Sequence, residues 1–87
     1  MNLTKPVTVF VLYGCPYCKG SIQMLKQKRI PFDAVNLGNK PQLAVQLAQE
    51  LNYPTVPKIF VEDQFIGGYS ELKAMVESGQ LDHLSRG

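Results

Sequence analysis

The segment over residues 7–16 constrains the fold of this chain more than any other. Residues 7–12, VTVFVL, are β-branched, aromatic or leucine with almost no polar alternation, a pattern typical of a strand buried on both faces of a sheet. Gly14 ends the run, and Pro16 suits the first position of a helix, where its missing N–H costs nothing. The sequence therefore predicts a buried strand followed directly by a helix, with Cys15 just before that helix.

The next segments continue the alternation of strands and helices. Apolar residues at helical spacing predict a helix to about residue 29, and Ile30-Pro31 breaks it because a residue before proline is pushed out of the α region. A second strand is expected over residues 32–37, followed by a turn at Gly38-Asn39. An amphipathic helix is expected from Pro41 to residue 51.

The last third of the sequence predicts a hairpin and one more helix. Residues 58–61 and 65–66 have the composition of two short strands, and Gly67-Gly68 follows them. Ser70 is the expected cap of the last helix, and Gly79 is placed to end it. The order is β-α-β-α-β-β-α. The first two strands should be parallel and the hairpin antiparallel, which predicts an α/β fold with a four-stranded mixed sheet flanked by helices.

Size and charge restrict the class of protein. The 87 residues, 45% of them hydrophobic, leave room for one core, so we expect a single domain over residues 1–87. Residues 1–32 carry five cationic side chains and no Asp or Glu, whereas the whole chain has a net charge of +2. This asymmetry favours an anionic partner at the N-terminal part, but the net charge is too small to argue for nucleic acid.

Neither a membrane span nor a signal peptide is evident in the sequence. No apolar run approaches the roughly 18 residues that a spanning helix needs, and the first ten residues lack the charged and apolar regions of a signal peptide. We therefore expect a cytoplasmic protein without membrane contact.

Two cysteines, Cys15 and Cys18, stand three positions apart in the motif CPYC. A permanent disulfide between them is disfavoured in a reducing cytosol and would close too short a loop to stabilise much. A structural zinc site needs four ligands, and His83 is the only other residue of that kind, so no metal is expected short of a site shared between subunits. The remaining alternatives are two inert buried thiols or a working dithiol, and the strand, glycine and helix-start context favours the dithiol.

The position of the two cysteines suggests different roles. Free backbone N–H groups and the positive end of the helix dipole favour a thiolate at Cys15. Cys18 lies one turn inside the helix and should be less exposed. We therefore expect Cys15 to attack a disulfide as the nucleophile and Cys18 to resolve the mixed disulfide that forms.

Three other places are candidates for ligand binding. The TVP segment, Thr55, Val56 and Pro57, either holds a cis proline that exposes the Val56 backbone to an extended ligand or simply starts a strand in the trans form. The GGYS segment, residues 67–70, is either a carboxylate site at a helix N-terminus or an ordinary glycine turn. Tyr17 either walls a ligand groove or packs against the protein.

The motifs CPYC, TVPKIFV and IGGYSEL, in this order and spacing, closely resemble those of the dithiol glutaredoxins of the thioredoxin superfamily, over about residues 7–85. The resemblance implies a thioredoxin-like fold and a glutathione-dependent thiol-disulfide oxidoreductase. It also implies that Cys15 carries the glutathionyl group, whereas Cys18 is needed only for protein disulfides. The implied glutathione-binding residues are Tyr17, Thr55, Val56, a cis Pro57, Gly68, Tyr69 and Ser70.

The sequence departs from the family pattern at two positions. Leu12 stands where many glutaredoxins carry a lysine that contacts the glycyl carboxylate of glutathione, and Lys19 or Lys58 is a candidate to compensate. Tyr69 stands where a cysteine is frequent.

The leading hypothesis is an enzyme, expected as a monomer, that reduces glutathionylated proteins and protein disulfides with electrons from glutathione, its co-substrate. Ribonucleotide reductase is a candidate recipient of electrons. Because Leu12 stands in place of the family lysine, a second hypothesis is a related protein that receives its electrons from thioredoxin reductase. A [2Fe-2S] cluster carrier is a third hypothesis, against which the rigid Pro16 argues.

Overall fold

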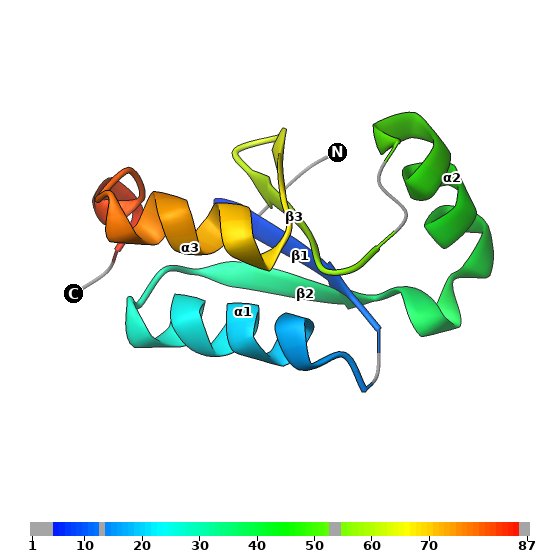
Figure 1. Cartoon of the computed structure of the whole chain (residues 1–87), viewed down its shortest axis with the longest axis horizontal. Helices are drawn as coiled ribbons and strands as arrows, with labels where there is room; N and C mark the ends of the chain where they lie inside the picture. Colours follow the sequence, from blue (N-terminus) through cyan, green and yellow to red (C-terminus); the bar gives the residue numbers. More distant parts are fainter. Residues whose placement is uncertain (1–4, 13, 53–54, 86–87) are drawn as a thin grey trace.

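The computed structural model describes residues 5–12, 14–52 and 55–85, and its helices and strands follow the expected order (Figure 1). The elements are β1 (Val7–Val11), α1 (Pro16–Gln27), β2 (Phe32–Asn36), the 3-10 helix η1 (Leu37–Asn39), α2 (Pro41–Leu51), β3 (Lys58–Val61), β4 (Gln64–Gly67), α3 (Tyr69–Glu77) and the 3-10 helix η2 (Asp82–Leu84).

The four strands form one mixed sheet in the order β2-β1-β3-β4. β1 runs parallel to β2, with Val9 opposite Ala34, and antiparallel to β3, with Val9 opposite Ile59. The hairpin of β3 and β4 is antiparallel. The predicted α/β fold, the parallel pairing of the first two strands and the antiparallel hairpin are confirmed.

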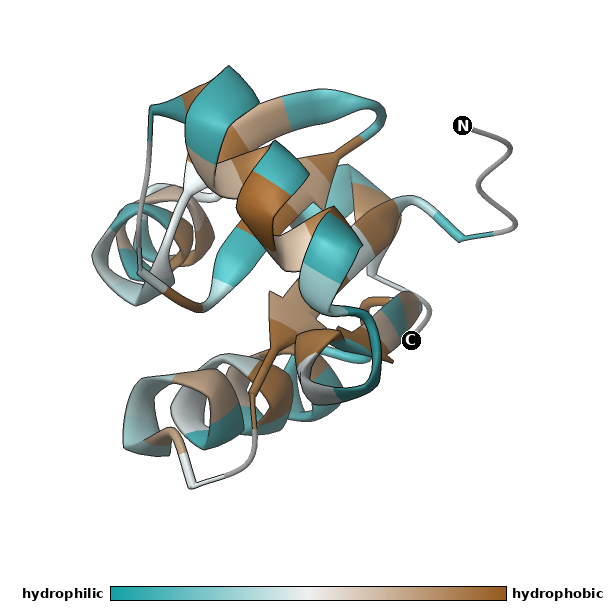
Figure 2. Ribbon diagram, turned by 90° about the vertical axis from the view of Figure 1, so that its right-hand side faces the viewer, coloured by the Kyte–Doolittle hydropathy of each residue, from teal (hydrophilic) through white to brown (hydrophobic). Residues whose placement is uncertain are grey.

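The sheet separates two hydrophobic clusters. Alternate residues of β1 face opposite sides, so Val7 and Val9 pack with Leu25 of α1 and Leu72 of α3 on one face. Phe10 faces the other side. There it packs with Leu37 of η1, Leu47 of α2 and other residues of the second cluster. Figure 1 shows α1 and α3 side by side along the sheet, and Figure 2 shows the hydrophobic residues gathered where the strands meet the helices. This packing explains why β1 has no polar alternation.

Several boundaries differ from those that the sequence predicts. α1 ends at Gln27 rather than near residue 29, because Arg29 adopts a left-handed conformation with φ of 56° that turns the chain toward Ile30. β2 ends at Asn36 rather than at Leu37, since the Asn36 side chain accepts a hydrogen bond from the Gly38 N–H and starts η1. The hydrophobic patterns locate each element but not its last residue.

Ser70 is not the cap of α3, as the sequence analysis expected. Gly68 occupies the N-cap position, α3 begins at Tyr69, and Ser70 is the exposed second residue of the helix. The Glu71 carboxylate accepts a hydrogen bond from the Gly68 N–H at 2.7 Å. A Cβ on Gly67, whose φ is +117°, would lie 2.6 Å from that carboxylate oxygen, so this approach requires glycine.

Thr8 gives a test of the core that does not involve the site. Its side chain is 2% exposed, and its hydroxyl has no hydrogen-bond partner within the described residues. Thr8→Val removes this unpaired hydroxyl while keeping the shape, so the free energy of unfolding in urea is expected to rise by about 1 kcal/mol. Thr8→Ala, the control, should lower it because it leaves a cavity. A clear loss of stability in Thr8→Val would contradict the assignment of an unpaired hydroxyl.

Candidate active site

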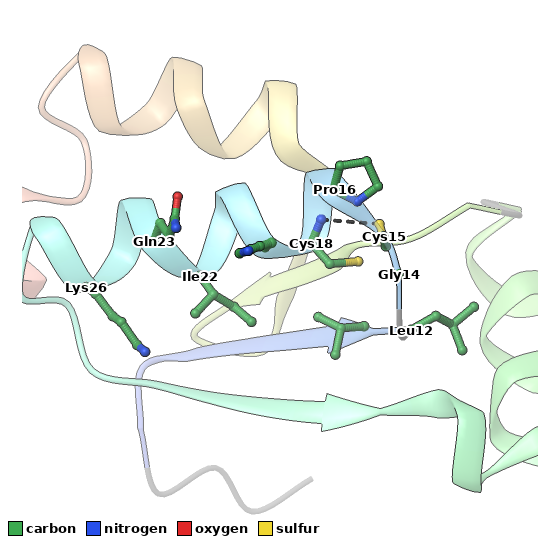
Figure 3. Close-up of a pocket in the computed structure, with 10 residues that line it drawn as sticks. Leu12, Gly14, Cys15, Pro16, Cys18, Ile22, Gln23 and Lys26 are labelled. Atoms are coloured by element: carbon green, nitrogen blue, oxygen red, sulfur yellow. Dashed lines mark hydrogen bonds between the residues drawn. The ribbon is translucent and has the colours of Figure 1, made fainter.

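Cys15 lies immediately before α1, as the sequence predicts. It is the N-cap residue, Pro16 is the first helical residue, and the Cys15 side chain is partly exposed. Its Sγ accepts a hydrogen bond from the Cys18 backbone N–H at 3.2 Å, shown as a dashed line in Figure 3. This sulfur therefore sits at the positive end of the helix dipole and receives one of the N–H groups that the helix leaves free.

The Val56 carbonyl lies on another side of the same sulfur. The Cys15 thiol donates to this oxygen at 3.8 Å, and the Val56–Pro57 peptide bond is cis. Val56 is 41 positions away in the sequence, so this contact joins the CPYC and TVP motifs in space. Both free cysteines and the backbone of the TVP segment thus belong to one site.

Cys18 is the buried member of the pair. Its side chain is 3% exposed, and burial together with a hydrogen bond to Cys15 raises the pKa of its thiol to about 11. A backbone hydrogen bond with Leu12 acts in the opposite direction. At neutral pH Cys18 is therefore protonated and shielded from solvent, whereas Cys15 is accessible at the helix end.

An open groove of about 680 Å³ lies beside the two sulfur atoms, and Figure 3 draws the residues that line it. It follows α1 away from the cysteines, and its lining includes the apolar side chains of Val11 and Ile22. Lys19 and Lys26 also line the groove, and both side chains are exposed. The remaining lining residues are Leu12, Gly14, Cys15, Pro16, Cys18 and Gln23.

Tyr17 and Tyr69 come together near the starts of α1 and α3. Their ring centroids are 5.7 Å apart with a tilt of 45°, and the Tyr17 side chain is exposed. Gly20 makes room for this pair, since a Cβ there would lie 3.2 Å from the Tyr69 ring. The contact brings the GGYS segment next to α1, so Gly68, Tyr69 and Ser70 lie close to the helix that carries the cysteines.

The structure also shows a site feature that the sequence only touched on. Lys58, the residue after Pro57, is 2% exposed, and its Nζ donates a hydrogen bond to the Thr55 carbonyl at 3.0 Å. Lysine is rarely buried to this extent, and hydrophobic patterning assigns it to a surface. The only signal in the sequence is a lysine that directly follows the TVP motif at the start of a buried strand.

The geometry of the site defines a class of protein. A partly exposed thiol at a helix N-terminus, a second thiol one turn deeper and a cis proline opposite them lie on a thioredoxin-like fold, and together they define a thiol-disulfide oxidoreductase. The glutaredoxin family model matches residues 7–66. The chain belongs to the glutaredoxin family.

One bacterial relative, one fungal relative and one plant structure show how similar the chain is to known members of the family. It is 34% identical over 79 residues to a glutaredoxin of Pseudomonas aeruginosa, covering 91% of this chain and 94% of the relative. It is 38% identical over 80 residues to glutaredoxin-2 of Schizosaccharomyces pombe, covering 88% and 73%. The crystal structure of a wheat glutaredoxin superposes with a TM-score of 0.85 at 28% identity, covering 94% of this chain and 79% of that one.

Two further observations concern membrane-spanning helices and metal-binding clusters. No helix in the described part of the chain is long and apolar enough to cross a membrane. Within residues 5–12, 14–52 and 55–85, no three His, Cys, Asp or Glu side chains gather in a way that could hold a metal ion.

The raised pKa of Cys18 predicts selective alkylation. At about pH 8, only about one Cys18 thiol in a thousand would be ionised with a pKa of about 11, so pulsed iodoacetamide should label Cys15 alone. Because the thiolate is the reactive form, labelling of Cys18 should increase only as the pH rises toward 11. Mass spectrometry of the labelled peptides measures both sites.

The control for this labelling experiment is the unfolded protein. In urea, burial no longer raises the pKa of Cys18, and both cysteines should react at similar rates. If Cys18 of the folded protein reacted at about pH 8 as fast as in urea, the assignment of a buried, protonated thiol would be wrong.

Proposed function

We propose that this glutaredoxin reduces glutathionylated proteins and protein disulfides with glutathione as the electron donor. The observation that carries the proposal is the position of the Cys15 sulfur, which is partly exposed, receives the Cys18 N–H and touches the Val56 carbonyl. The hydrogen bond from the Cys18 N–H favours a nucleophilic thiolate at Cys15. An extended peptide-like ligand such as glutathione needs backbone groups to pair with, of the kind that Val56 offers.

The reaction on a glutathionylated protein requires Cys15 alone. The Cys15 thiolate attacks the glutathione sulfur of the mixed disulfide, a bond forms between these two sulfurs, and the protein thiolate leaves and takes a proton from water. A second glutathione thiolate then attacks the glutathione sulfur bound to Cys15. This step releases glutathione disulfide and restores the Cys15 thiolate.

The reaction on a protein disulfide uses both cysteines. The Cys15 thiolate attacks one sulfur of the substrate and forms a mixed disulfide with it, while the S–S bond of the substrate breaks and its other sulfur leaves as a thiolate that takes a proton from water. Cys18 then attacks the Cys15 sulfur, so that a bond forms between Cys15 and Cys18 and the second substrate thiol leaves. Two glutathione molecules reduce the resulting disulfide. The substrate gains two electrons from the two cysteines. Two glutathione molecules return two electrons to these cysteines and become glutathione disulfide.

The proposed glutathione site comprises Tyr17, Thr55, Val56, Pro57, Gly68, Tyr69 and Ser70. The Gly68 N–H is already bound by Glu71, which leaves the first-turn amides of Tyr69 and Ser70 for the γ-glutamyl carboxylate. In this proposal the Val56 backbone, whose carbonyl the Cys15 thiol contacts, pairs with the cysteinyl unit, and the Tyr17–Tyr69 pair forms one wall. A buckwheat relative with the same fold has been crystallised as a complex with glutathione, at 22% identity and a TM-score of 0.85.

The wider biological role is part of the same proposal. We expect the protein to act as a monomer in the cytoplasm, with glutathionylated and disulfide-containing proteins as partners. Ribonucleotide reductase is a candidate among them.

A coupled assay tests the electron donor. The purified protein is given a small glutathione mixed disulfide, NADPH, glutathione and glutathione reductase, and NADPH oxidation is followed. In a parallel assay thioredoxin reductase replaces glutathione and its reductase. Turnover in the first assay alone supports the proposal.

The second candidate is a redoxin that thioredoxin reductase supplies, and Leu12 is the observation that favours it. This side chain is 41% exposed beside the cysteines, where it offers no positive charge to a glycyl carboxylate. Turnover with thioredoxin reductase alone would establish this candidate and overturn the dependence on glutathione.

A further inference from the structure

The groove along α1 continues beyond the residues that the proposed reaction uses. Its volume of about 680 Å³ is within the range of roughly 300–1,000 Å³ that is typical of ligand sites. Lys19, Ile22, Gln23 and Lys26 line it at helical spacing, so they lie next to one another along α1. None of the seven residues proposed to bind glutathione is among the described residues that line it. The groove therefore offers a surface beside Cys15 that the proposed glutathione site does not occupy.

The charge of the groove has one sign. Its described lining residues all come from residues 11–26, and residues 1–32 contain no Asp or Glu. Lys19 and Lys26 are exposed, and neither belongs to an ion pair within the part of the chain that the structure describes. Two positive charges therefore stand along the groove without an acidic side chain of the same segment to pair with, which favours an anionic occupant.

The groove also presents apolar side chains. Ile22 is half-buried and stands between the two lysines in the sequence of α1, and Leu12 is exposed beside the cysteines. Figure 3 shows Ile22 and Lys26 extending from α1 toward the side on which β1 lies. A small inorganic anion would use only the charges, whereas a peptide with acidic and apolar side chains would use both kinds of group. The chemistry of the lining therefore fits a peptide segment.

We propose that this groove binds an extended segment of the substrate protein next to its reacting cysteine, with acidic side chains at Lys19 and Lys26 and an apolar side chain at Ile22. The inference rests on the proposed function, because it names the part of a protein substrate that lies beside Cys15 during the attack. Glutathione occupies the Val56 side of the same sulfur, and the protein segment occupies the α1 side.

The geometry of α1 predicts where the acidic side chains stand in the substrate. Lys19 and Lys26 follow Cys15 by four and eleven residues, which at about 1.5 Å per residue places them about 6 Å and about 17 Å along the helix. An extended chain advances about 3.3 Å per residue, so the matching acidic residues stand about two and about five positions from the substrate cysteine. By the same arithmetic, Ile22 corresponds to about the third position.

The expected preference is that of two exposed ion pairs. Each such pair changes an affinity by about 1.5- to fivefold. Two pairs together should favour an acidic segment about three- to tenfold at low salt. The preference should nearly vanish in about 1 M salt, because exposed charges are then screened within about 3 Å.

The experiment measures the attack of Cys15 on synthetic peptides in the absence of glutathione. Each peptide carries a cysteine coupled to thionitrobenzoate, with glutamate at the second and fifth positions from it and leucine at the third, on either its N-terminal or its C-terminal side. The Cys15 thiolate attacks the peptide sulfur, a bond forms between these two sulfurs, and coloured thionitrobenzoate leaves as a thiolate. Twin peptides with glutamine in place of glutamate give the rate without the charges.

The wild type is expected to release thionitrobenzoate about three- to tenfold faster from at least one glutamate peptide than from its glutamine twin. Lys19→Gln and Lys26→Gln should each lower this ratio about two- to threefold. Lys28→Gln is the matched control, because it removes the same charge at the C-terminal end of α1 from a residue that is not among those lining the groove. Its ratio should stay within about 1.3-fold of the wild type. A change in the reactivity of Cys15 cancels, since each ratio compares two peptides on one variant.

Two results would overturn the inference alone. One is release from every glutamate peptide at the rate of its glutamine twin. The other is a ratio that Lys28→Gln lowers as much as Lys26→Gln does, because the preference would then come from the general charge of the protein and not from the groove. No release from any peptide would mean that Cys15 is not the nucleophile, and the proposed function would fail together with this inference. Failure of glutathione as a donor in the coupled assay would leave the measurement unaffected, because no glutathione is present in it.

Discussion

Cys15→Ser is expected to abolish all thiol-disulfide turnover, with a loss of about 10³-fold or more on both mixed disulfides and protein disulfides. A serine hydroxyl does not ionise near neutral pH and forms no disulfide, so neither half of the reaction can begin. The coupled assay with a glutathione mixed disulfide, and an assay on a protein disulfide, measure the two activities.

The same substitution should leave the fold intact, which makes the loss informative. Cys15 is the N-cap of α1 and accepts a hydrogen bond from the Cys18 N–H. Serine is among the preferred N-cap residues and can accept the same bond. Cys15→Ala, which removes the cap, should lower the free energy of unfolding by about 1 kcal/mol relative to Cys15→Ser. Turnover by Cys15→Ser above about a tenth of the wild-type rate would exclude Cys15 as the nucleophile.

Local patterns were sufficient to predict the fold because each element has a strong signal of its own. β1 is buried on both faces and has no polar alternation, whereas Pro16 and Pro41 occupy the first helical positions of α1 and α2. The start of α3 was placed two residues too late, because serine is a common cap and the sequence does not show that Glu71 binds the Gly68 N–H instead. A turn that depends on the φ of Gly67 is a property of the hairpin and the helix together.

The candidate site was predicted in two unequal parts. The position of Cys15 at the start of a helix follows from the local sequence, since a strand, a glycine and a proline fix it. The contact between Cys15 and Val56 joins residues 41 positions apart, and only the resemblance to a family suggested it. The burial of Lys58 had no signal in hydrophobic patterning, because lysine normally predicts a surface and the packing of β3 overrides that preference.

Cys18→Ser is expected to separate the two activities rather than abolish both. Removal of glutathione from a small mixed disulfide should persist at a rate similar to that of the wild type, because Cys15 and external glutathione complete that cycle. Reduction of a protein disulfide should fall by about 10²-fold, since the resolving thiol acts within the molecule and an external thiol at millimolar concentration does not replace its proximity. Both rates can be measured on one preparation.

The burial of Cys18 is the physical reason to expect that its role is limited to this step. At 3% exposure and with a pKa raised to about 11, it cannot meet an external disulfide in either the required position or the required ionisation state. It can attack only a sulfur that the site brings to it, namely that of Cys15. Cys18→Ala serves as the matched control without a buried hydroxyl, and it should reproduce the separation of activities. If Cys18→Ser and Cys18→Ala both lost mixed-disulfide turnover as completely as Cys15→Ser, Cys18 would act in the first step, and the division of roles between the two cysteines would be wrong.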